Sequence, residues 1–79
     1  MSPTVFKEKN YRFFFFSREE NRLHIHVVSP DGEAKFWIEP NIELAKSVGF
    51  NKKQIKLLEK AIKNRENEIR NSWEEHFGG

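Results

Sequence analysis

LHIHVVSPDGEAKFWI, residues 23–38, decides the fold because it has the pattern of two strands joined by a tight turn. The turn is SPDG, with proline second, aspartate third and glycine fourth, which is a strong β-turn signal. LHIHVV before it is rich in β-branched residues, and EAKFWI after it alternates between polar and apolar side chains. We therefore predict an antiparallel hairpin of strands 23–28 and 33–38.

The register of this hairpin sorts its side chains into two faces. If Val28 pairs with Glu33, one face is entirely apolar: Leu23, Ile25, Val27, Ala34, Phe36 and Ile38. The opposite face, here called the outer face, carries His24, His26, Val28, Glu33, Lys35 and Trp37. A slip by one residue would mix the two sets, so the register is well specified. The apolar face is therefore predicted to be the core.

The preceding strand, 11–17, brings aromatic rings to both faces. In YRFFFF, residues 11–16, neighbouring side chains point to opposite sides of the sheet. One set is Tyr11, Phe13 and Phe15, and the other is Arg12, Phe14 and Phe16. The sequence leaves open which set is buried, but either one adds rings to the outer face beside Trp37. Such a face is unusual for a soluble monomer, so we interpret it as an interaction or active surface.

The remaining elements complete an α+β prediction. A weaker strand is expected at 5–8. After Pro40, NIELAKSVG predicts a short helix over 41–48, with Asn41 as N-cap and Gly49 as its stop. Asn51 can cap a long helix over 51–77, whose apolar stripe is Ile55, Leu58, Ile62, Ile69, Trp73 and Phe77. We expect a single domain, residues 1–79: a small antiparallel sheet of three to four strands packed on a short helix and a long C-terminal helix.

The amino-acid composition and the absence of certain motifs exclude several classes of function. The net charge is +2, from 14 basic and 12 acidic residues, which permits nucleic-acid binding without indicating it. The absence of cysteine excludes disulfides and thiolate chemistry. We recognise no signal peptide, membrane span, Gly-rich phosphate loop, nucleophile elbow or HExxH motif. The expectation is a cytoplasmic protein without a cofactor.

Two histidines carry the strongest chemical signal. His24 and His26 lie two apart on a strand, so their rings should point the same way, as in metal-binding His-x-His strands. They are weak metal candidates because no further ligand is indicated. With Lys35 and Arg65 they are also the candidates for catalysis. The alternative is a structural role, with imidazoles flanking Trp37 or making cross-strand contacts.

The candidate binding residues are Arg12, Phe14, Phe16 and Trp37. Aromatic rings interleaved with cations are typical of single-stranded RNA binding. Arg18 and Arg22 would extend such a patch, unless they pair with Glu19 and Glu20 in a solvated loop.

Several stretches together resemble a small prokaryotic family, domain-of-unknown-function family 4160. They are YRFFFFS, HIHV, GEAKFWIEP, ELA followed by GF, and WEEHF. The chain departs from the family pattern at Leu23, where proline is usual, and at Asn64, where histidine often precedes the arginine. The resemblance carries over His24, His26, Trp37 and Arg65 as signature residues, without catalytic roles. Members of the family are often encoded beside a small protein of family 2442, an arrangement that has led to suggestions of a toxin–antitoxin pair, so the resemblance implies such a protein as the partner.

Two functions follow as hypotheses. The first is an interaction module whose outer face binds a cognate small protein, of the family 2442 type, or a second copy of the chain. The second is a ribonuclease-like toxin acting on RNA through His24 and His26 with nearby cations.

Overall fold

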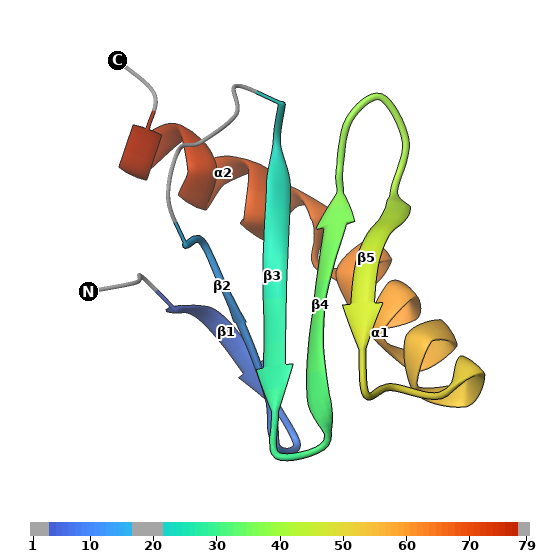
Figure 1. The fold of residues 1–79 in the computed structure, drawn as a ribbon. Helices are drawn as coiled ribbons and strands as arrows, with labels where there is room; N and C mark the ends of the chain where they lie inside the picture. Colours follow the sequence, from blue (N-terminus) through green and yellow to red (C-terminus); the bar gives the residue numbers. More distant parts are fainter. Residues whose placement is uncertain (1–3, 17–21, 78–79) are drawn as a thin grey trace.

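The computed structural model describes residues 4–16 and 22–77. It contains a five-stranded antiparallel sheet with both helices behind one face (Figure 1). The strands are β1 (Thr4–Glu8), β2 (Tyr11–Phe14), β3 (His24–Ser29), β4 (Gly32–Trp37) and β5 (Glu43–Val48), and they lie side by side in chain order. The helices are α1 (Lys52–Asn64) and α2 (Glu66–Phe77). The α+β class is confirmed, with five strands where three to four were predicted.

The central hairpin has the predicted register. Val28 pairs with Glu33, and the pairing continues to His24 opposite Trp37. The six apolar residues assigned to one face are all buried: Leu23, Ile25, Val27, Ala34, Phe36 and Ile38. The tight turn and the two-residue alternation were therefore enough to sort this hairpin into a core face and an outer face.

The aromatic strand buries the set that begins with Tyr11. Phe13 and Phe15 are 0% and 1% exposed, and Phe13 stacks on Phe6 of β1 with ring centroids 4.2 Å apart. The helices cover these rings with the expected stripe, of which Leu58, Ile62, Ile69 and Trp73 are buried. Arg12, Phe14 and Phe16 consequently belong to the outer face, which settles the alternative that the sequence left open.

The predicted helix over 41–48 is wrong, because Glu43–Val48 form β5. This segment pairs with β4 along its length, with Lys46 opposite Lys35 and a shift of register at the Lys35–Phe36 step. Gly49 does not end a helix: its φ of +90° turns the chain, and a Cβ there would collide with the carbonyl oxygen of Asp31. Tertiary pairing with β4 thus overrode a weak local helix signal.

The predicted long helix over 51–77 is divided at Arg65, where the backbone has φ −117° and ψ 23°. The Arg65 N–H donates to the carbonyl oxygens of both Ala61 and Ile62, a shared bond common at helix ends. The N-cap prediction is confirmed, because the Asn51 side chain accepts a bond from the Gln54 N–H in a capping box. Each helix buries its own part of the stripe, and the division falls at the interruption of that stripe.

Arg70 links α2 to the segment after β4 through a salt bridge with Glu39. Arg70 donates to Glu39 at 2.8 Å and to Glu66 at 2.9 Å, and these hydrogen bonds raise the pKa of the guanidinium. The Glu39–Pro40 peptide bond in this segment is cis.

Candidate functional site

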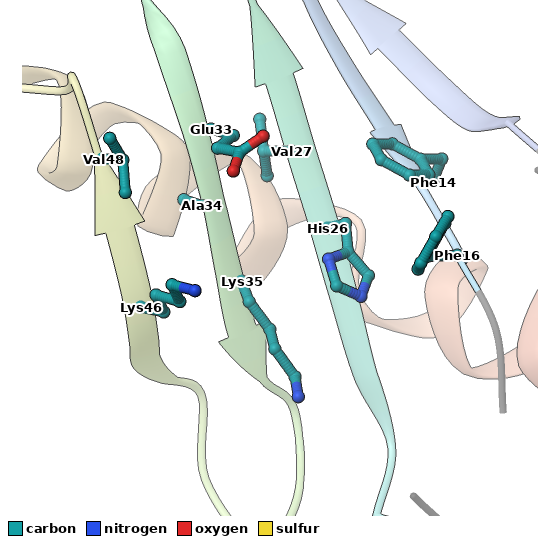
Figure 2. Close-up of a pocket in the computed structure, with 9 residues that line it drawn as sticks. All are labelled: Phe14, Phe16, His26, Val27, Glu33, Ala34, Lys35, Lys46 and Val48. Carbon is teal, nitrogen blue, oxygen red and sulfur yellow. The ribbon is translucent and has the colours of Figure 1, made fainter. Parts of the chain in front are cut away.

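The outer face of the sheet is the side opposite the helices, and Figure 2 looks onto it. A row of paired residues crosses it from β2 to β5: Phe14, His26, Lys35 and Lys46. Aromatic rings therefore stand on β2, an imidazole on β3, and two ammonium groups on β4 and β5. No described helix or strand covers these side chains.

A shallow groove of about 390 Å³ runs along this row. Its lining residues are Phe14, Phe16, His26, Val27, Glu33, Ala34, Lys35, Lys46 and Val48. Phe16 and Val48, at opposite ends in Figure 2, are 58% and 56% exposed. The groove is a candidate binding surface, because apolar side chains lie at both ends and cations lie between them.

Cations cover several ring faces on the outer face. The Arg12 guanidinium lies 4.6 Å from the centre of the Phe14 ring, and the His26 ring stacks on Phe14 with ring centroids 5.6 Å apart. Trp37 receives the Arg22 guanidinium at 4.3 Å and the Lys35 ammonium at 4.4 Å. Cation–π contacts of this kind hold rings and charges in fixed relative positions. The three predicted binding residues Arg12, Phe14 and Trp37 are thus engaged with other side chains of the protein, whereas Phe16 is mostly exposed.

His24 does not lie open on the outer face beside His26. It is 2% exposed, and its ring lies 5.8 Å from that of Trp37 and 5.2 Å from that of Trp73 in α2. Its Nδ1 is 2.7 Å from the Arg22 carbonyl oxygen, and since a carbonyl only accepts, Nδ1 carries the proton and donates. The recorded pairing of β2 with β3 ends at His26, so at His24 the sheet has no paired β2 residue on that side.

Of the four predicted catalytic candidates, His24 and His26 have ring centroids 5.4 Å apart and Lys35 pairs with His26, whereas Arg65 lies apart. His26 and Lys35 are directly opposite each other and both line the groove. Arg65 lies on the helix side, where its guanidinium is 4.5 Å from the centre of the Phe6 ring and 3.1 Å from a Glu68 oxygen. His24 is buried. Within residues 4–16 and 22–77 no group of three histidine or acidic side chains is placed to hold a metal ion.

Two groove residues, Lys46 and Val48, were missed by the sequence reasoning. Both were assigned to the predicted helix, where neither would have joined the sheet. The apolar residues Ile42, Leu44 and Val48 fit a strand as well as a helix, so the sequence held no decisive signal for this strand. A bulge opposite the Lys35–Phe36 step changes the register within β5, and no local pattern announced it.

These observations define a small α+β protein with one helix-covered sheet face and one open face of rings and cations. The chain belongs to the family described as Domain of unknown function (DUF4160), whose family model matches residues 10–74. The match runs from the turn before β2 into the last turns of α2, which confirms the resemblance seen in the sequence. No curated protein and no solved structure matches the chain. Among the described helices, none is long and apolar enough to cross a membrane.

Proposed function

We propose that the protein is a small interaction module that binds a cognate small protein through the outer face. The partner would be of the family 2442 type, and the two would form a toxin–antitoxin pair in the cytoplasm. The observation that carries the proposal is the open outer face itself, which combines exposed apolar side chains with an excess of positive charge. Its described residues include five cations (Lys7, Arg12, Arg22, Lys35 and Lys46) against two carboxylates (Glu33 and Glu43).

The chemistry of this face matches what protein interfaces use. Aromatic and arginine side chains are enriched at interfaces and dominate their binding energy. Here Arg12 on Phe14 and Arg22 on Trp37 supply two such pairs, ordered before any partner arrives. Ordering in advance lowers the entropic cost of binding.

The charge pattern favours a different protein over a second copy of the chain. In a twofold dimer the same patch faces itself, so the groove lysines Lys35 and Lys46 of one copy would lie near those of the other copy. Like charges brought together in this way oppose association. An acidic partner surface instead complements them.

Co-expression with a small protein of the family 2442 type tests the proposal. We expect the wild-type chain to co-elute with it in size-exclusion chromatography with light scattering, and Phe16→Asp to prevent this. Leu44→Asp is the matched control, since Leu44 is also exposed but pairs with the core residue Phe36. No complex with the wild type would overturn the proposed partner. An unchanged complex with Phe16→Asp would overturn the proposed surface.

RNA cleavage is the second candidate function, and the position of His26 favours it. His26 lines the groove opposite Lys35, an arrangement that offers a general base or acid beside a cation. Because His24 is buried, this proposal depends on His26 for contact with substrate. Expression in a host cell should arrest growth, and His26→Ala should restore it. Equal growth of cells carrying wild type and His26→Ala would remove this reading.

A further inference from the structure

We infer that the groove receives an acidic side chain of the protein partner over Lys35 and Lys46, with an apolar side chain of the same segment packed on Phe16. The inference rests on the proposed function and adds the chemistry that the partner must present. It follows from how charge and apolar surface are distributed along the groove (Figure 2).

The lysine pair lies on the β4–β5 side of the groove. Lys35 and Lys46 are directly opposite each other on neighbouring strands, and side chains in that relation are neighbours whose like charges repel. Lys46 is exposed and makes no ion pair with the residues that the structure describes. A carboxylate bound at Lys46 would be attracted by the positive charges of both lysines, so the groove favours an acidic partner.

Aromatic surface lies on the β2 side of the groove. Phe16 is 58% exposed and touches His26 edge-on, with ring centroids 5.9 Å apart. Neighbouring strands are about 4.8 Å apart, so a segment that crosses from the β4–β5 lysines to β2 covers about 12 Å, which is about four residues of extended chain. The matching partner segment therefore carries an acidic residue and an apolar residue four positions apart.

Stacking of RNA bases explains the same face less well. Base stacking needs free ring faces, yet Arg12 lies over Phe14, and Arg22 and Lys35 lie over Trp37. Among the described rings of this face, Phe16 is the one left mostly exposed for a base. A carboxylate of a protein partner needs no ring face, because it can bind the sides of the cations that point away from the rings.

The direct test is a titration of ¹⁵N-labelled protein with short peptides, followed by NMR. The probe Glu-Ser-Thr-Ser-Phe should shift the amide signals of Lys35, Lys46 and Phe16 in a saturable way, whereas Lys-Ser-Thr-Ser-Phe should not. Lys46→Glu should weaken binding of the acidic peptide at least about tenfold, and Lys63→Glu on α1 should leave it unchanged. In the Lys46→Glu variant a carboxylate lies opposite Lys35 in place of a second ammonium group. The melting temperature of the variant should therefore be no lower than that of the wild type.

Three results would overturn the inference. They are equal shifts with both peptides, no shift with either, or tighter binding of an eight-nucleotide uridine RNA that Lys46→Glu abolishes. The co-expression experiment separates this failure from that of the proposed function. If Phe16→Asp breaks the complex with the partner while Lys46→Glu leaves it intact, the outer face binds the partner but the acidic contact is wrong.

Discussion

At the scale of single residues, alternation along one strand places chemically identical side chains in opposite environments. Phe13 is fully buried against Phe6 and the helices, whereas Phe16 is mostly exposed. Phe13→Ala should cost about 3–5 kcal/mol, from lost burial and the cavity left behind, which is enough to unfold much of a domain whose stability is of that order. Phe16→Ala should change stability by no more than about 0.5 kcal/mol. Urea unfolding followed by circular dichroism measures both, and comparable losses would contradict the assigned faces.

The buried histidine supports a structural role of the kind weighed from the sequence. His24 donates from Nδ1 to the Arg22 carbonyl and packs between two tryptophans. His24→Ala should therefore lower the free energy of unfolding by about 2–3 kcal/mol, by removing both the bond and the packing. His26→Ala should cost about 1 kcal/mol or less, because His26 is only partly buried. His24→Asn, whose amide can donate near the Nδ1 position, should recover part of the loss. An equal effect of the two alanine variants would contradict this distinction.

At the scale of elements, the sequence correctly predicted the strands and helices whose apolar residues were periodic and whose ends carried a turn or capping signal. The 23–38 hairpin had a proline–glycine turn and six apolar residues on one face, so its register could be derived completely. The helix start at Asn51 carried its own capping signal. By contrast, the segment 41–48 begins at Asn41, which can cap a helix, and is followed by Gly49, which can end one. Its apolar residues show neither a clear helical period nor a clear strand period. Its structure as β5 depends on the exposed edge of β4, which no local signal reports.

The same limit applies to the candidate site. The outer-face positions of Arg12, Phe14 and Trp37 followed from alternation alone once the buried aromatic set was known. The burial of His24 did not, because it depends on where pairing with β2 ends and on contact with Trp73, which is distant in the chain. Lys46 was missed together with β5.

The junction between β5 and the hairpin turn gives a prediction at this scale. Gly49 has φ +90°, and a Cβ on it would meet the Asp31 carbonyl oxygen. Gly49→Ala should cost at least about 1–3 kcal/mol from the backbone conformation alone. Lys9, which has φ +56° in the β1–β2 turn, supplies the opposite control. Lys9→Gly should be neutral or stabilising, by up to about 1 kcal/mol. Thermal unfolding compares the two, and a stable Gly49→Ala would contradict the described turn.

At the scale of the whole molecule, the sheet discourages pairing at its edges and leaves its outer face open. Both edge strands, β1 and β5, have an irregular register, and each carries a lysine, Lys7 or Lys46. Bulges and edge lysines are devices that oppose strand-to-strand association. Under the proposed function, docking would therefore be directed to the outer face, where the cation excess opposes contact with a second copy of the chain.

Because of this excess of positive charge, we expect the protein to be a monomer when no partner is present. At about 100 μM in 0.1 M salt, light scattering should give the mass of one chain, because a twofold contact through the outer face would bring Lys35 and Lys46 against their own copies. Lys46→Glu lowers this repulsion, because the introduced carboxylate can face Lys35 of the other copy, and it should permit weak self-association that added salt suppresses. Lys63→Glu, the same change on α1, should remain monomeric. A wild-type dimer that Phe16→Asp dissociates would show instead that the outer face binds its own copy, and the acidic partner would no longer be needed to explain the exposed rings.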